Sequence, residues 1–526
     1  MVMTQRLLFF VQLGLLALLS SAMQPLTQAW FAVLLLTKAY QLTHPAHSVW
    51  SVRTANLLAI AGISCFLMLY QQLGVVHLMI HFLYFAAVLR LLSIRFQQHD
   101  VAQLLLVHYL LFACCFILQQ QLWFALVVTP FLILNLIAQW LWASGDAEPQ
   151  WQFPARPIAL SMVLMLLLFV IAPRLSPFWQ VPSPKVAKTG LSEVMSANSI
   201  DQLLTSDELA FRVSFDDNNQ ALNTAMYFRS RIYNTFDGNE WQSSFNQRPL
   251  RFDSTLPRIR YQVIAEPHQQ QWLFGLGSAV DIKPSDIFSN QHGLLVRQQP
   301  LAQRIAYQVS SIDAIPKTER SLQAFLQLPS ALNPQTLQLA QQSILQGHST
   351  AQVVRRFSEL VASGDYRYTL SPGAMTSPHA VDEFLFSRKR GFCVHYAQAA
   401  TVFLRAAGVP ARMVGGYLGG QWQANDRYLR VSQANAHAWV EYLENNQWKR
   451  YDPTLLVYPE LTQQNASLQQ GGLLQQLGGD FWSPGHFGGM LIQWVQDLDY
   501  YWASYVLSFE KDDQQLLQDQ LKQWLQ

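Results

Sequence analysis

Three residues in the C-terminal half of the chain, Cys393, His437 and Asp452, have the types that thiol chemistry requires. A cysteine nucleophile needs a base that takes its proton and returns it to a leaving group. The base in turn needs an acceptor on its second ring nitrogen, which fixes its tautomer and its orientation. Cysteine, histidine and aspartate supply these three roles, so we expect Cys393, His437 and Asp452 to form one catalytic site.

The sequence around Cys393 predicts that this residue lies at the N-terminus of a helix. Gly391 interrupts the preceding segment. Small and apolar residues then recur at helical spacing, at Ala397, Ala400, Phe403, Leu404 and Ala407. The N–H groups and the partial positive charge at a helix start favour a thiolate and can hold an oxyanion. A lone cysteine that opens a helix is often only a buried small residue, so this location alone does not assign it a role.

His437 and Asp452 fall on a predicted β-hairpin that follows the cysteine helix. Alternating and β-branched segments predict strands at 412–418, 427–432, 437–443 and 447–451. Asn445 and Asn446 form the bend between the last two strands. If this bend pairs the strands, the beginning of one lies beside the end of the other, and His437 and Asp452 become neighbours. We expect this antiparallel sheet to lie against the cysteine helix.

Cysteine usage and charge exclude several other kinds of site. Cys65, Cys114 and Cys115 lie within apolar segments, which leaves Cys393 as the only cysteine in the polar part of the chain. One cysteine cannot form an intramolecular disulfide there, and no CxxC pair or Cys/His cluster has the spacing of a zinc site. No acidic cluster has the spacing of a calcium loop, so we expect neither a metal nor a cofactor. The formal net charge of +2, without a basic stripe, argues against nucleic acid as a partner.

The first part of the chain has the composition of a membrane domain. Apolar segments long enough, or nearly long enough, to cross a bilayer lie at 5–22, 26–42, 54–71, 73–93, 101–118, 121–143 and 157–172. We therefore expect an all-α transmembrane bundle of about seven spans over residues 1–173, with the lipid bilayer as its partner. The second and third segments are short, which leaves counts of five or six open. Ser20, Ser21 and Ala22 could also form a signal-peptidase site.

Basic residues predict the orientation of this membrane domain. Lysine and arginine fall in every second connection, at Arg6, Lys38, Arg53, Arg90, Arg95 and Arg156. Because basic connections stay in the cytoplasm, an odd number of spans places the rest of the chain on the other side. We expect a multi-pass membrane protein with an extracytoplasmic catalytic domain, which in a Gram-negative bacterium means the inner (cytoplasmic) membrane and the periplasm. The intramembrane residues His77, His81 and His108 are interpreted as packing or interfacial residues.

The polar part of the chain is expected to contain two folded regions and a tail. Short alternating strands predict an extracytoplasmic β-rich module at 174–318. Apolar residues at helical spacing then lead into an α+β domain at 319–470, which carries Cys393, His437 and Asp452. Residues 471–526 are expected to form a linker and amphipathic helices. Asp497 and Asp499 interrupt the aromatic residues of 488–507, which favours an interfacial helix over a span.

The segments that carry the candidate site resemble the core of the transglutaminase-like superfamily. The matching segments are Gly391-Phe392-Cys393 with His395-Tyr396-Ala397, the run 405–412, Gly416-Tyr417, the run 436–441, and Asp452-Pro453-Thr454. The whole chain resembles the bacterial membrane-anchored transglutaminase-like proteins of the TgpA type, in which a helical membrane domain precedes an extracytoplasmic catalytic domain. The resemblance implies an α+β transglutaminase-like (papain-like) cysteine domain with Cys393 as nucleophile, His437 as base and Asp452 as orienting acid.

The chain departs from this family pattern in two places. Val394 follows the cysteine, where such proteins often have glutamate. Relatives of this type also continue into a further membrane helix and a cytosolic domain, whereas this chain stops at Gln526. We expect either a naturally short form or a truncated sequence.

The resemblance implies attack on a glutamine carboxamide through a thioester. The leading hypothesis is a membrane-anchored thiol acyltransferase of the protein-glutamine gamma-glutamyltransferase type, acting on proteins or peptides that carry glutamine, with an amine or water as acceptor. A cysteine peptidase or amidase is the alternative, because the same residues can pass the acyl group to water. A non-catalytic envelope scaffold is the third hypothesis. Trp439 could shield the thioester or belong to the core, His395 could contact substrate or pack, and Arg412 and Arg427 are expected to form ion pairs.

Overall fold

The computed structural model of the chain describes residues 2–44, 52–68, 70–93, 98–119, 122–143, 155–171, 191–195, 204–216, 226–238, 240–243, 248–250, 255–315, 322–329, 332–373, 375, 377–423, 428–461, 487–502, 514, 518, 520, 522 and 523. The expected domain boundaries at 173/174, 318/319 and 470/471, and the predicted ion pair of Arg427, lie outside these residues. The chain forms two compact units, one of Met1–Pro182 with Phe509–Gln526 and one of Ser183–Ser508.

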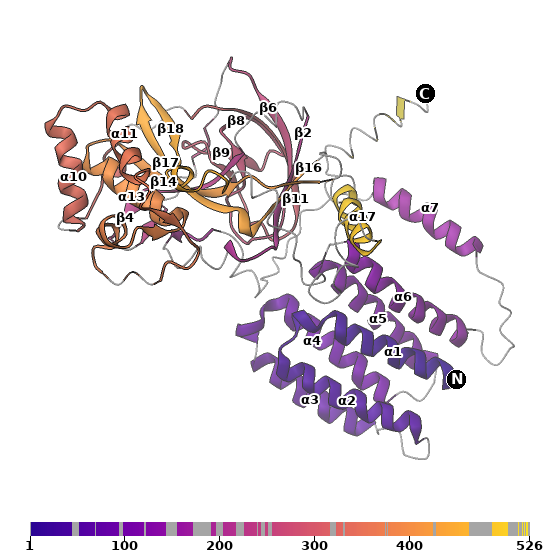
Figure 1. Ribbon diagram of the computed structural model, residues 1–526. Helices are drawn as coiled ribbons and strands as arrows, with labels where there is room; N and C mark the ends of the chain where they lie inside the picture. The colour runs from indigo at the N-terminus through magenta and orange to yellow at the C-terminus, as the bar shows by residue number, and fades with distance from the viewer. Residues whose placement is uncertain are drawn as a thin grey trace. The chain divides into compact units, whose positions relative to one another are not determined.

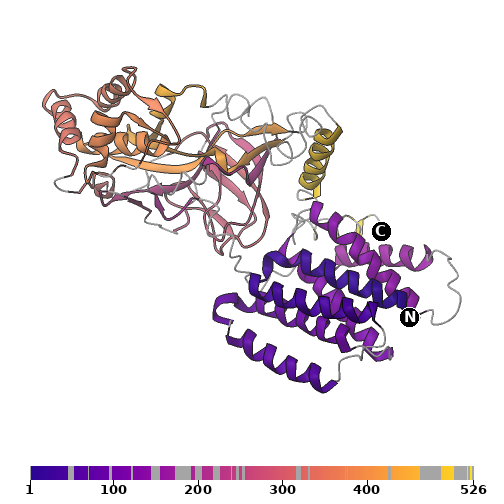
Figure 2. The same cartoon turned by 60° about the horizontal axis from the view of Figure 1, so that its bottom comes forward.

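The first unit is helical. Its helices are α1 (Val2–Leu18), α2 (Pro25–Thr43), α3 (Val52–Met68), α4 (Tyr70–Ser93), α5 (Gln98–Leu118), α6 (Leu122–Ala143) and α7 (Ala155–Ile171) (Figures 1 and 2). They lie where the apolar segments of the sequence predicted helices. Three segments, Val76–Ser93, Asp100–Leu118 and Trp123–Ala143, are long and apolar enough to cross a membrane.

Polar side chains inside this unit pair across helices. The two ring nitrogens of His108 lie 2.7 Å from Gln12 Oε1 and 2.9 Å from Asn135 Oδ1. His81 Nε2 lies 3.2 Å from Thr27 Oγ1. Both histidines are fully buried. Because hydrocarbon offers no hydrogen-bond partner, such contacts join neighbouring helices. This finding agrees with the packing interpretation of His81 and His108.

A five-stranded antiparallel sheet, in the order β18-β17-β14-β3-β7, organises the second unit (Figure 1). Its strands are β3 (Tyr227–Tyr233), β7 (Gly275–Leu276), β14 (Ala411–Leu418), β17 (Ala436–Glu444) and β18 (Gln447–Tyr451). Asn445 and Asn446 join β17 to β18 with φ values of 51° and 60°, the left-handed conformation that a two-residue hairpin turn favours. The predicted hairpin is confirmed.

A second, six-stranded antiparallel sheet has the order β15-β16-β2-β6-β11-β8. It contains β2 (Leu209–Phe215), β6 (Ile259–Ala265), β8 (Ser278–Lys283), β11 (Ile305–Ile312), β15 (Gln421–Gln423) and β16 (Tyr428–Ser432). Strands β15 and β16 come from the part of the chain that follows the cysteine helix, whereas β3 and β7 of the other sheet come from the part before it. The two sequence regions therefore exchange strands and share one hydrophobic core.

Three helices pack into this core: α10 (Pro334–Leu345), α11 (Thr350–Val361) and α13 (Cys393–Ala406). Helix α13 contacts β14, β17 and both other helices. All of its residues from Cys393 to Arg405 are buried, so the helix runs through the interior of the unit. Ser349 and Gln352 form a capping box that begins α11. The sequence predicted these helices from the change of hydrophobic period.

Smaller elements complete the two units. They are η1 (Ser20–Ala22), β1 (Val194–Met195), β4 (Thr235–Phe236), β5 (Trp241–Gln242), β9 (Ile287–Ser289), β10 (Leu295–Arg297), η3 (Gln323–Phe325), β12 (Arg367–Tyr368), α12 (Ala380–Asp382), η4 (Glu383–Arg388), β13 (Arg390–Gly391), η5 (Gln433–Asn435) and α14 (Thr454–Val457). Of these, the parallel pair β12 and β13 matters most for the site, because it leads directly into α13.

Helix α17 (Phe487–Trp502) packs on the six-stranded sheet. Asp499 accepts hydrogen bonds from Arg212 Nη2 at 2.8 Å and from Arg304 Nη1 at 3.3 Å. Asp497 accepts one from the hydroxyl of Tyr428 at 3.2 Å. The two acidic residues that interrupt the aromatic pattern of this segment are therefore paired with the sheet, which gives them a structural role inside the unit.

Candidate active site

Cys393 is the first residue of α13, as the sequence predicted. The backbone N–H of Phe392 donates to His395 Nδ1 at 3.3 Å, and the N–H of His395 donates to the carbonyl of Phe392 at 2.9 Å. These two bonds fix the entry into the helix. A Cβ on Gly391 would lie 2.8 Å from the side chain of His395, so glycine is the residue that fits there.

His437 and Asp452 face each other at the end of the hairpin. His437 lies at the start of β17, and its Nε2 lies 2.8 Å from Asp452 Oδ2. Nδ1 is then the ring nitrogen that remains for Cys393, whose thiol interacts with the His437 side chain. Cys393 is 0% exposed, and the side chains of His437 and Asp452 are 3% and 4% exposed. The structure thus brings the three predicted site residues together in a buried cluster.

The carboxylate of Asp452 controls the protonation of His437. Burial by itself lowers the pKa of the imidazole, but the charge of Asp452, its hydrogen bond and the contact with Cys393 outweigh burial and raise the pKa of His437 to about 10. Burial also works to raise the pKa of Asp452, but His437, Tyr227 and the N–H of Thr454 together hold it below its usual range. The carboxylate of Asp452 therefore favours the protonated form of His437.

Two further groups hold the carboxylate of Asp452. The hydroxyl of Tyr227 donates to Oδ2 at 2.9 Å, and the backbone N–H of Thr454 donates to Oδ1 at 3.0 Å. Arg450 lies over the other side of the Tyr227 ring, with Cζ 4.2 Å from the ring centroid. Tyr227 belongs to β3, far from Asp452 in sequence. The five-stranded sheet is what brings it to the site.

Aromatic rings form a wall beside His437. The ring of Trp439 lies nearly parallel to the imidazole, with centroids 6.2 Å apart. The Tyr227 ring meets Trp439 edge-on at 5.1 Å. Trp439 is fully buried and packs with Leu294 and Val414 in a small hydrophobic cluster. The core interpretation of Trp439 therefore holds, and the indole also forms part of the surroundings of His437.

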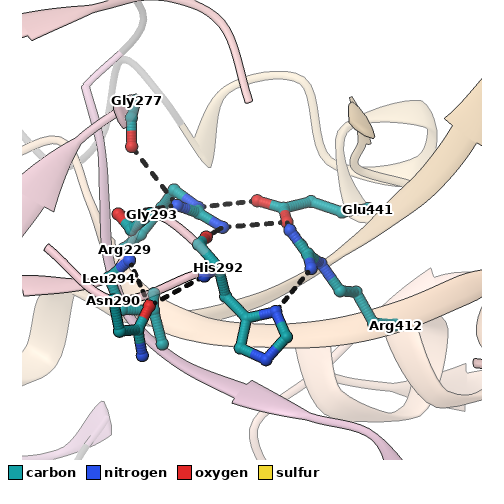
Figure 3. Close-up of polar contacts among 8 residues, drawn as sticks. All are labelled: Arg229, Gly277, Asn290, His292, Gly293, Leu294, Arg412 and Glu441. Atoms are coloured by element: carbon teal, nitrogen blue, oxygen red, sulfur yellow. Dashed lines mark hydrogen bonds and ion pairs between the residues drawn. The ribbon is translucent and has the colours of Figure 1, made fainter. Parts of the chain in front are cut away.

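A buried cluster of Arg229, Arg412 and Glu441 ties the strand of His437 to its neighbours (Figure 3). Glu441 on β17 accepts from Arg229 Nε at 2.7 Å and from Arg412 Nε at 2.8 Å. Burial raises the pKa of Glu441, but the two guanidinium groups outweigh it and hold that pKa below its usual range. Arg229 also donates to the carbonyls of Gly277, His292 and Gly293, as Figure 3 shows. The predicted ion pair of Arg412 is confirmed.

The sequence pointed to His395 but left its role open between substrate contact and packing. Its ring accepts a backbone hydrogen bond, and burial lowers the pKa of His395 to about 4. This histidine is therefore neutral and belongs to the helix cap. Val394, the departure from the family pattern, is fully buried next to it.

Sequence reasoning missed Tyr227 and Arg229. Both alternate on β3, a strand whose seven residues are all buried. Alternating polar and aromatic residues in a strand normally indicate one face in water. In β3 the second face is covered as well. The available signal for a buried ion cluster was the presence of two arginines in this predicted strand and of a glutamate on the strand of His437.

Within the residues that the structure describes, no group of three or more His, Cys, Asp or Glu side chains could hold a metal ion.

Two family models match the chain. The model described as the TgpA N-terminal domain matches residues 7–317, and the model of the transglutaminase-like superfamily matches residues 338–453. The second match includes Cys393, His437 and Asp452. The first covers most of the helical unit and the strands that the earlier part of the chain adds to the two sheets.

Curated relatives agree with these models. The chain is 38% identical over 374 residues to a protein-glutamine gamma-glutamyltransferase of Pseudomonas aeruginosa. The aligned region covers 67% of this chain and 55% of the relative. It is 33% identical over 143 residues to the uncharacterized protein YebA of Bacillus subtilis, which covers 25% of this chain and 19% of that relative. The chain thus spans less than two thirds of either relative.

Among solved structures, the chain is similar to the periplasmic domain of TgpA from Pseudomonas aeruginosa bound to ethylmercury. The identity is 39%, the match covers 52% of this chain and 99% of that one, and the TM-score is 0.48. A family model that matches residues 7–317 covers more than half of a chain of 526 residues. The chain therefore belongs to the TgpA family of transglutaminase-like proteins.

Proposed function

We propose that this protein is a membrane-anchored, transglutaminase-like thiol acyltransferase in which Cys393 is the nucleophile, His437 the acid and base, and Asp452 the residue that orients His437. The observation that carries the proposal is the buried contact of His437 with Asp452 on one side and Cys393 on the other. The name of the Pseudomonas relative, protein-glutamine gamma-glutamyltransferase, supports the same reaction class.

The first half of the reaction forms a thioester. In the reactive state, the proton of Cys393 lies on Nδ1 of His437, and the sulfur is the thiolate, which is the nucleophilic form. The sulfur attacks the side-chain carboxamide carbon of a glutamine, and the negative charge moves to the carbonyl oxygen. Backbone N–H groups at the start of α13 can stabilise this negative charge. His437 then gives its proton to the departing nitrogen, ammonia leaves, and the acyl group stays on Cys393.

The second half transfers the acyl group. A primary amine attacks the thioester carbon, and neutral His437 takes the proton from the amine nitrogen. The carbon–sulfur bond breaks, an amide forms, and the thiolate–imidazolium pair is restored. Throughout both halves, Asp452 stays hydrogen-bonded to Nε2 of His437. Nδ1 therefore stays directed at the reacting atoms.

We further propose that the helical unit spans the bacterial inner membrane several times and that Ser183–Ser508 functions in the periplasm. The three long apolar helices and the placement of basic residues in alternate connections support this topology. Glutamine-bearing proteins or peptides of the envelope are the substrates that such a location makes available.

The test is amine incorporation by the full chain in detergent or lipid nanodiscs. A glutamine-donor dipeptide is incubated with a fluorescent primary amine, and ammonia release is measured in parallel. We expect both signals in the wild type and neither in Cys393→Ala. Cys115→Ala, which removes a buried thiol of the helical unit, serves as the matched control and should behave like wild type.

A cysteine amidase or peptidase is the second candidate, since water can replace the amine in the second half. The burial of Cys393 and His437 favours transfer, because a site closed to water gives an amine more time to reach the thioester. Ammonia release that depends on Cys393 but leaves no amine in the product would assign the chain to this second class. If both products were absent at every pH, the enzyme proposal itself would fail.

A further inference from the structure

We propose that Tyr227 is a positioning residue for this site: from strand β3 it holds the carboxylate of Asp452 against His437. The proposal rests on the function proposed above for Cys393 and His437, but its test does not need an acyl substrate. The hydrogen bond from Tyr227 to Asp452 adds a fourth side chain to the cluster of Cys393, His437 and Asp452. Tyr227 lies in the sequence before the segment that matches the transglutaminase-like model.

The contacts of Asp452 are the first step of the argument. Oδ2 accepts a hydrogen bond from the hydroxyl of Tyr227 at 2.9 Å and lies 2.8 Å from His437 Nε2. Oδ1 accepts a hydrogen bond from the backbone N–H of Thr454 at 3.0 Å. Three donors from three elements therefore fix the rotation of the carboxylate. Without the phenol, the oxygen that serves His437 would keep only the imidazole, and the carboxylate could turn away from it.

Tyr227 is itself held rigidly. Tyr227 is 6% exposed, and its ring packs edge-on against Trp439 and under the guanidinium of Arg450. Two residues further along β3, Arg229 binds Glu441 on the strand of His437, as Figure 3 shows. This ion pair anchors β3 to β17 in space, and strand β14 lies between them. The position of the phenol relative to His437 is thereby determined by the sheet.

The protonation of Tyr227 fits a permanent donor. Burial and then the negative charge of Asp452 raise the pKa of its phenol, so it keeps its proton at any working pH. The titratable and charged groups around Asp452 are His437 from β17, Tyr227 from β3, Tyr451 from β18, Tyr368 from β12 and Cys393 from α13, with Arg450 beyond the Tyr227 ring. Among the described side chains, hydrogen bonds to the carboxylate come from His437 and Tyr227.

The test compares two Tyr→Phe variants on the same strand. Tyr227→Phe removes the donor to Asp452, whereas Tyr233→Phe removes the hydroxyl of another buried tyrosine, which donates to the carbonyl of Ser192 at 2.8 Å. The rate of alkylation of Cys393 by iodoacetamide is measured in the full chain from pH 4 to pH 10, by mass spectrometry of the Cys393 peptide. We expect Tyr227→Phe to lower the rate at neutral pH about tenfold, as for the loss of a hydrogen bond to a charged group. The acid limb of the pH profile, where the alkylation rate rises with pH, should move to higher pH.

Tyr233→Phe should leave both the rate and the acid limb unchanged. Equal losses in the two variants with no displaced acid limb, or an unchanged curve for Tyr227→Phe, would overturn the proposal. The combination Tyr227→Phe with Asp452→Asn gives a second criterion: if Tyr227 acts through Asp452, adding Tyr227→Phe should cause no further loss.

A second variant, which keeps the hydroxyl, tests the proposal even if Tyr227→Phe does not fold. Incorporation of 3-fluorotyrosine at position 227 strengthens the donor without changing the shape of the ring, and it should move the acid limb to lower pH. A shift in the opposite direction, or none, would contradict the proposal. Since alkylation needs no glutamine substrate, a chain that shows these shifts but transfers no amine would refute the proposed function and leave the role of Tyr227 standing.

Discussion

The phenol of Tyr227 and the imidazole of His437 converge on one oxygen of Asp452, at 2.9 and 2.8 Å. The two residues lie on β3 and β17, which are separated by β14 in the five-stranded sheet. The site is therefore built by a sheet that takes strands from both parts of the chain. Its chemistry should respond to changes in the sheet as well as to changes in the three reacting residues.

Removal of the thiol is the first prediction. Cys393→Ala should lower amine incorporation by at least about 10³-fold, because the covalent step is lost while the rest of the site stays in place. Cys393→Ser should lose a comparable amount, since a serine hydroxyl gives up its proton far less readily than a thiol. The unfolding temperature of both variants should stay close to that of wild type. An active Cys393→Ala would show that the thiol is not the nucleophile.

The second prediction concerns the charge of Asp452. Asp452→Asn removes the carboxylate that raises the pKa of His437 to about 10, while burial, which lowers that pKa, remains. The imidazolium should then lose its proton at a lower pH, and activity at neutral pH should fall on the order of 10²-fold or more. The pH dependence of the rate between pH 5 and pH 10 measures this change. Asp365→Asn, at an exposed carboxylate paired with Lys389, is the control and should leave the profile unchanged.

The third prediction concerns the buried Glu441. Glu441→Gln leaves two buried guanidinium groups, Arg229 and Arg412, without a counter-charge and should reduce the free energy of unfolding by about 3–5 kcal/mol. Glu359→Gln breaks an exposed pair with Arg355 and should change it by less than about 1 kcal/mol. Chemical unfolding at pH 7 compares the two. Similar values for both would mean that the cluster does not stabilise the fold.

The same residue predicts a pH dependence of stability. The pKa of Glu441 is lower in the folded chain than in the unfolded chain, so its stabilising contribution is complete above the unfolded value, about 4.5. It is lost as the pH falls through the lower folded value. Wild type should therefore lose more stability than Glu441→Gln between pH 5 and pH 3, and the two curves should approach each other in acid.

The fourth prediction uses two neighbouring glycines of β14. A Cβ on Gly416 would lie 2.0 Å from the carbonyl oxygen of Phe228 and 2.6 Å from the Trp439 ring, so Gly416→Ala must push strands apart and should cost about 3 kcal/mol or more. A Cβ on Gly415 would meet first the flexible end of Met195, at 2.8 Å. Gly415→Ala should therefore be the milder change in thermal unfolding, and the reverse order would contradict this packing.

The sequence by itself determined the local features of this protein. Hydrophobic period located the helices of the first unit, the helix that begins at Cys393 and the strands β14, β17 and β18, because these elements depend on residues close together in the chain. The Asn445-Asn446 turn set the hairpin and so brought His437 and Asp452 together over a separation of 15 residues. Short-range geometry was sufficient for these relationships.

Only the tertiary structure decided which distant segments complete the site. The pairing of β3 with β14 places Tyr227 at Asp452 and Arg229 at Glu441. Both contacts join residues more than 200 positions apart, and no local pattern encodes such a register. The same holds for Asp499, which a linear pattern presents as a solvent or membrane-surface charge but which pairs with Arg212 and Arg304. The physical reason is that burial and charge pairing are properties of packed neighbours, and long-range packing chooses those neighbours.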